Sequence, residues 1–148
     1  MSAAFAQTSV PASSTEVGKA QVKANNKKAD AQATANKKKS DAQVDASKAQ
    51  ASANENKADA QADANKAAAK VSSATSVNEA SDARADANKA QVKANKKKAN
   101  AQATANDKKR DANKKASVAQ AKADETKVEA QSDANKTTAE AKVDAAKK

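Results

Sequence analysis

Residues 19–36 read KAQVKANNKKADAQATAN, and residues 89–106 read KAQVKANKKKANAQATAN. The two segments differ at only two of eighteen positions, and the second begins at Lys89 where the first begins at Lys19. Agreement this close indicates an internal duplication, and an internal repeat decides the architecture before any local motif does. Whatever structure one copy forms, the other copy is expected to form as well.

In each copy, one series of Ala residues is spaced by either four or seven positions from each Ala to the next. A step of four and a step of seven make an 11-residue repeat, which spans three helical turns at about 3.67 residues per turn. One face of each helix is therefore lined by Ala, and the spacing predicts a helix-packing stripe. Its members are Ala20, Ala24, Ala31, Ala35, Ala42, Ala46, Ala53, Ala60 and Ala64 in the first copy and Ala90, Ala94, Ala101, Ala105, Ala112, Ala116, Ala123, Ala130 and Ala134 in the second.

A second stripe of mostly small apolar residues lies two positions further along the chain. In the first copy it consists of Val22, Ala29, Ala33, Ser40, Val44, Ala51, Ala58, Ala62 and Ala69. In the second copy it is less apolar, because Arg110 and Lys114 take two of its places.

The apolar content of the chain is almost entirely Ala. Of 148 residues, 44 are Ala and ten are Val, whereas Leu, Ile, Trp, Tyr, Cys and His are absent. Burial of a methyl-sized group contributes on the order of 0.8 kcal/mol, and ordering one residue costs about 1–2 kcal/mol. This composition argues against a globular core. It favours an all-α or conditionally disordered chain of one or two long Ala-rich helices, and two such helices could pack as an antiparallel hairpin.

The least helical stretch between the copies is Ser72-Ser73-Ala74-Thr75-Ser76-Val77-Asn78. Its hydroxyl and β-branched side chains favour local alternatives to helix. We expect a leader at residues 1–18, a first helical copy at 19–71, a turn or kink at 72–88 and a second helical copy at 89–148. A single continuous helix is the competing arrangement, since neither Gly nor Pro enforces a turn there.

The first residues differ from the rest, because Met1 to Thr15 carry no charged side chain and hold the only Phe and the only Pro. Ala4-Phe5-Ala6 before Gln7 has the small-x-small form of a signal-peptidase site, which indicates cleavage after residue 6 and a periplasmic or secreted chain. The basic and long apolar regions of a signal are missing. A chance match and a cytoplasmic chain are therefore the alternative.

The inventory of side chains predicts that the chain is not an enzyme and holds no cofactor, metal or small-molecule substrate. It lacks His and Cys, and a Ser or Thr nucleophile needs a positioned base in a dry site. No stretch is apolar enough for a membrane span.

The net charge is +10, which favours anionic partners. Because no aromatic side chain is interleaved with the basic runs for stacking, contact with a polyanion would be made to phosphates and would depend strongly on salt. The candidate contacts lie in basic runs, at Lys37, Lys38, Lys39, Lys96, Lys97, Lys98, Lys108, Lys109 and Arg110.

Units such as residues 31–41, AQATANKKKSD, resemble the 11-residue repeats of group 3 late-embryogenesis-abundant proteins and the hydrophilin-type proteins of bacterial desiccation tolerance. The resemblance covers residues 19–148 and rests on period and composition. It implies a chain that is disordered in dilute water, becomes helical on drying and shields membranes or proteins. Clustered Lys and abundant Asn depart from that family's pattern.

The leading hypothesis is a non-enzymatic, hydrophilic stress-protective protein. One alternative is a helical structural, envelope or filament protein that associates with itself through its Ala faces. The other alternative is a non-specific binder of nucleic acid or another polyanion.

Overall fold

The computed structural model describes residues 11–147, which form two helices: α1, Pro11–Ser72, and α2, Val77–Lys147. Within this part of the chain the two helices pack together and there is no strand. The predicted all-α class is confirmed. The predicted cleavage site at Ala4-Phe5-Ala6 lies outside the described residues.

Both helices consist largely of Ala and Lys, with Gln interspersed, and all three are good helix formers. Pro11 is the first residue of α1, where the missing N–H of proline has no helical partner to lose. The start of α2 is capped, because the hydroxyl of Ser76 accepts a hydrogen bond from the backbone N–H of Glu79 at 3.1 Å. The carboxylate of Glu79 in turn accepts from the backbone N–H and the hydroxyl of Thr75, at 3.0 and 2.8 Å. These bonds fix the point at which the second helix begins.

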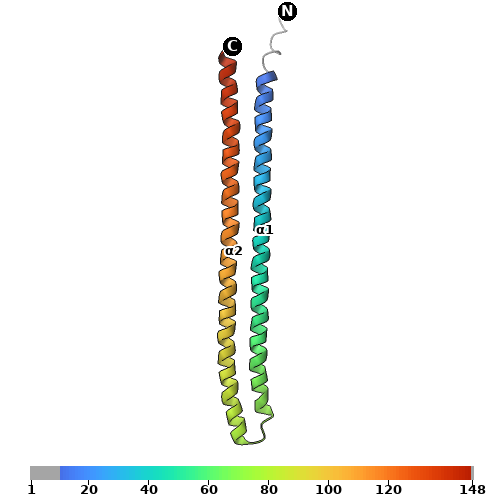
Figure 1. The fold of residues 1–148 in the computed structure, drawn as a ribbon, viewed down its shortest axis with the longest axis vertical. Helices are drawn as coiled ribbons and strands as arrows, with labels where there is room; N and C mark the ends of the chain where they lie inside the picture. Colours follow the sequence, from blue (N-terminus) through green and yellow to red (C-terminus); the bar gives the residue numbers. More distant parts are fainter. Residues whose placement is uncertain (1–10, 148) are drawn as a thin grey trace, which may run out of the picture. The chain divides into compact units, whose positions relative to one another are not determined.

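The chain divides into two compact units. Unit 2 is Asp41–Lys114 and contains the link between the helices, so that its two helical segments run antiparallel as a hairpin (Figure 1). Unit 1 consists of Met1–Ser40 and Lys115–Lys148, and in its described part segments of α1 and α2 also pack side by side. Each unit therefore pairs a segment of the first helix with a segment of the second.

The core of the described part of the chain consists of Ala. Fifteen residues are buried among those described, and all of them are Ala. Ala24 packs with Ala130 and Ala134 in unit 1, while Ala60 and Ala64 pack with Ala94 in unit 2. Every buried Ala of α1 has a buried counterpart at the duplicated position of α2, as the repeat requires; these residues of α1 are Ala24, Ala35, Ala42, Ala49, Ala53, Ala60 and Ala64.

The helix bounds differ from the predicted segments. The predicted turn or kink at 72–88 is much shorter in the structure, since only residues 73–76 lie between the helices. The cap formed by Ser76 and Glu79 starts α2 directly after the cluster of hydroxyl residues. α1 also includes residues 11–18, which belong to the predicted leader.

Enlarging a buried Ala is expected to weaken the pairing of the helices. Ala60→Leu should lower the free energy of unfolding by about 1–3 kcal/mol, because a longer side chain cannot enter a close-packed contact without displacing the backbone. Ala62→Leu is the matched control, since Ala62 is exposed, and its effect should stay within about 0.5 kcal/mol. Both changes in unfolding free energy are measured by thermal unfolding, with circular dichroism as the signal. The buffer contains trimethylamine oxide, which strengthens burial. Equal effects of the two variants would contradict a close Ala contact.

The capping bonds lower the pKa of Glu79 below its ordinary value of 4.5, because the backbone N–H and then the hydroxyl of Thr75 stabilise the charged carboxylate. A depressed pKa means that the cap is fully present above the unfolded-state value and is lost as the pH falls through the folded-state value. A carboxyl-detected NMR titration should find the pKa of Glu79 below 4.5, and Thr75→Ala should raise it. An unchanged titration in Thr75→Ala would show that the hydroxyl bond does not form.

Candidate functional site

The surface on which the two helices meet, here called the seam, is the candidate site of this protein. It consists of the buried Ala residues, a row of Gln side chains and a set of half-buried Lys side chains.

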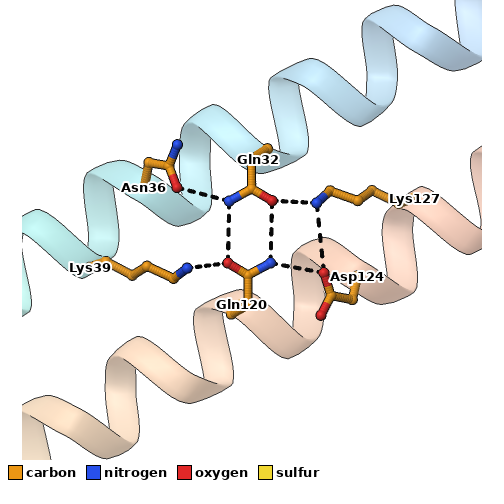
Figure 2. Close-up of polar contacts among 6 residues, drawn as sticks. All are labelled: Gln32, Asn36, Lys39, Gln120, Asp124 and Lys127. Carbon is orange, nitrogen blue, oxygen red and sulfur yellow. Dashed lines mark hydrogen bonds and ion pairs between the residues drawn. The ribbon is translucent and has the colours of Figure 1, made fainter.

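Glutamine side chains pair across the seam. In unit 1, Gln32 and Gln120 each donate from Nε2 to the Oε1 atom of the other at 3.2 Å, and Figure 2 shows the resulting ring of two bonds. Gln21 and Gln131 form the same ring in unit 1. In unit 2 the pairs are Gln50 with Gln102, at 3.3 and 3.2 Å, and Gln61 with Gln91, at 3.2 and 3.4 Å.

Each paired amide of Figure 2 is also bonded by neighbours on both helices. The second N–H of Gln32 is donated to Asn36 at 2.8 Å, one helical turn later on the same helix, and Gln120 donates likewise to Asp124. Lys127 donates to the oxygen of Gln32, and Lys39 donates to the oxygen of Gln120 (Figure 2). Both donors and both lone pairs of each amide are therefore used, which is the full capacity of a carboxamide.

The same arrangement occurs six times: a Gln, then Asn or Asp at the fourth position after it, then Lys at the seventh. The Lys side chains are half-buried, and each donates to a Gln of the opposite helix: Lys28, Lys39, Lys57, Lys98, Lys109 and Lys127. At Gln61 and Gln131 the seventh position is Ala68 and Thr138, so these two Gln are not followed by such a Lys.

One register accounts for all four Gln pairs, because the two residue numbers of each pair have the same sum. Along each helix the paired Gln are separated by steps of eleven, eighteen and eleven positions. These steps are close to three, five and three helical turns, so the Gln side chains stay on one edge of the Ala stripe. The unequal middle step makes the register specific, since sliding one helix by a single repeat would leave only two of the four pairs.

The opposite edge of the seam is a shallow groove. In unit 1 it is lined by Lys27, Lys38 and Lys122 with Thr34 and Thr126, among others. In unit 2 the equivalent groove has Lys97, Lys108 and Thr104 in the duplicated positions, together with Asp59 and Asp63. Both grooves are open to solvent.

The predicted packing stripe lies on the inner side of the helices. Six members are half-buried: Ala20, Ala31, Ala46, Ala90, Ala101 and Ala116. The other twelve are buried: Ala24, Ala35, Ala42, Ala53, Ala60, Ala64, Ala94, Ala105, Ala112, Ala123, Ala130 and Ala134. Sequence reasoning did not find the Gln pairs, and it left out Ala49, Ala119 and Ala141, which are buried. The regular spacing of Gln, Asn and Lys at i, i+4 and i+7 is the pattern that could have revealed the pairs.

The predicted polyanion contacts separate into two groups. Lys39, Lys98 and Lys109 are half-buried and donate to Gln side chains across the seam. The remaining candidates are exposed, and Arg110 forms an exposed ion pair with Asp107 at 3.2 Å; they are Lys37, Lys38, Lys96, Lys97, Lys108 and Arg110. Three of the nine side chains are thus engaged at the seam, and binding to a polyanion stays a prediction.

Within residues 11–147, no group of three or more acidic side chains is placed to hold a metal ion. Nor does either described helix contain a segment long and apolar enough to cross a membrane. No protein-family model, curated protein or solved structure matches the chain. The interpretation of the seam therefore rests on its own residues and their geometry.

The Gln pairs are expected to stabilise the contact between the helices. A double-mutant cycle of Gln32→Ala and Gln120→Ala should give a coupling free energy of about 0.5–1.5 kcal/mol, because each single variant removes both bonds of the ring. Gln43→Ala is the control, since Gln43 is exposed on α1, and it should show no coupling with Gln120→Ala. A coupling of zero for the paired residues, measured by thermal unfolding, would show that the rings contribute nothing.

Proposed function

We propose that the chain is a non-enzymatic, hydrophilic protective protein that keeps other molecules apart as water is lost, and that its ordered form is the Ala-packed pair of helices. The observation that carries this proposal is that, in the part of the chain that the structure describes, burial is confined to Ala methyl groups. Nearly every other described side chain faces water, including most of the charged ones. Such a surface binds water and offers other proteins little apolar area on which to aggregate.

The same observation makes folding depend on water. Methyl groups contribute little hydrophobic free energy when they are buried, while ordering of the backbone opposes folding at every residue. Polar bonds across the seam replace bonds to water, so their net contribution in dilute solution is small. When water is withdrawn, its competition for hydrogen bonds weakens. The hydrogen bonds of the helices and of the Gln pairs then contribute more to stability. The chain would then change from a hydrated coil into paired helices as drying proceeds.

Recovery of a drying-sensitive enzyme tests the proposal. The enzyme is dried with the chain or with the same mass of an ordinary globular protein, and its activity is measured after rehydration. The proposal expects clearly higher activity with the chain. Equal recovery with both additives would contradict a protective function.

Two variants of equal charge test the role of the paired helices in this assay. Carboxylates placed in the seam should prevent pairing, because an unpaired buried charge is strongly unfavourable. The same number of carboxylates on exposed positions should leave protection intact, and equal protection by both variants would exclude a role for the pairing. The seam variant combines Ala24→Asp, Ala60→Asp, Ala94→Asp and Ala130→Asp, and its control combines Ala29→Asp, Ala62→Asp, Ala99→Asp and Ala121→Asp.

A self-associating structural protein is the second candidate function, and one observation favours it. The second apolar stripe of α1 remains uncovered: Val22 is 59% exposed and Val44 is 47% exposed, and the Ala residues of the stripe are exposed as well. Association through this stripe should be abolished by Val22→Lys with Val44→Lys, whereas a protective monomer would sediment identically with and without these changes.

A further inference from the structure

We propose that the seam is also a surface for self-recognition, by which two copies of this chain form a dimer through exchange of α2. In this dimer α1 of one copy pairs with α2 of the other copy in the register seen within the chain. The inference does not depend on the protective function.

The first observation is the symmetry of the Gln spacing. The steps of eleven, eighteen and eleven positions read the same in both directions, and they occur on both α1 and α2. An antiparallel helix with this spacing can therefore pair with all four Gln of α1, whether that helix belongs to the same chain or to a second copy. The buried Ala positions repeat at the offset of the duplication, so a second copy also offers the methyl groups that the seam accepts.

The second observation concerns the linker, residues 73–76. It contains no Gly or Pro, and no described residue has the positive φ that a sharp turn often requires. Its hydrogen bonds are local, because they join it only to Lys70, Val71, Glu79 and Ala80. Straightening of the linker therefore breaks few bonds, and every interaction of the seam that opens within one chain forms again with the partner chain.

The strength of this dimer follows from the linker length. If the contacts are the same in both forms, the dissociation constant equals the effective concentration that the linker imposes, which is on the order of 1 mM for short linkers. Changes that favour a straight linker should strengthen the dimer. The hydroxyl groups of Ser73, Thr75 and Ser76 terminate α1 and cap α2, so their removal favours continuous helix.

Sedimentation equilibrium of the full chain measures this dissociation constant. It is carried out in a buffer with trimethylamine oxide, at chain concentrations between about 0.05 and about 2 mM, which lie on both sides of the expected value. The chain of 15.1 kDa should form a species of twice that mass. The combination of Ser73→Ala, Thr75→Ala and Ser76→Ala should lower the dissociation constant about tenfold, because a helix cap is worth about that factor in an equilibrium. The control combination of Ser40→Ala, Ser47→Ala and Ser117→Ala, all exposed and outside the linker, should leave it unchanged. A wild-type chain and a linker variant that both remain monomeric at the highest concentration would overturn the proposal.

Cross-linking identifies the surface used. Ala60→Cys with Ala94→Cys places two thiols in one cluster of the seam, and a short bis-maleimide should join them within a chain in the monomer and between chains in the dimer. Ala62→Cys with Val92→Cys is the control, since both residues are exposed. A dimer fraction that cross-links between chains only in the control pair would mean association through an outer face, and this result would also overturn the exchange.

Discussion

The structure depends on one constraint, which is that the two helices approach each other closely enough that only Ala fits between them. Every buried residue among those described is Ala, and each buried position of α1 is also buried at the duplicated position of α2. Close approach also brings the flanking Gln side chains within hydrogen-bond distance of one another, so that amides pair directly across the seam. A single larger side chain in the stripe would separate both the methyl contacts and the amide pairs.

The different side chains of the seam have different roles under this constraint. Methyl groups are alike at every position, so an Ala stripe alone specifies the face of each helix but only weakly specifies the register. The Gln pairs specify the register, because the unequal spacing of the Gln residues allows all four pairs in only one antiparallel alignment. Half-buried Lys side chains donate to six of the eight paired amide oxygens, and a Lys in this position keeps its ammonium group in contact with water.

Part of this architecture could be predicted from the sequence. The duplication and the Ala spacing predict helices with an inner stripe, and the described residues form two packed helices without strands. Ala49 and Ala119 were not predicted, because the buried positions leading to them are separated twice in succession by seven residues (35, 42, 49 and 105, 112, 119). The predicted spacing alternates there between four and seven. The linker is shorter than its Ser, Thr and Val residues suggest, because the Glu79 side chain makes part of that stretch a helix start. The Gln pairs could not be derived from helix propensity, since they depend on the distance between two helices.

The central claim is that methyl burial and amide pairing are sufficient for the paired helices only when water competes weakly. Far-ultraviolet circular dichroism of the full chain, recorded as water activity is lowered stepwise and then restored, measures this dependence directly. The account predicts low helix content in dilute buffer and a large, reversible rise as water is removed. A monomer with full helix content in dilute buffer, a sharp thermal transition and slowly exchanging amide protons would contradict it.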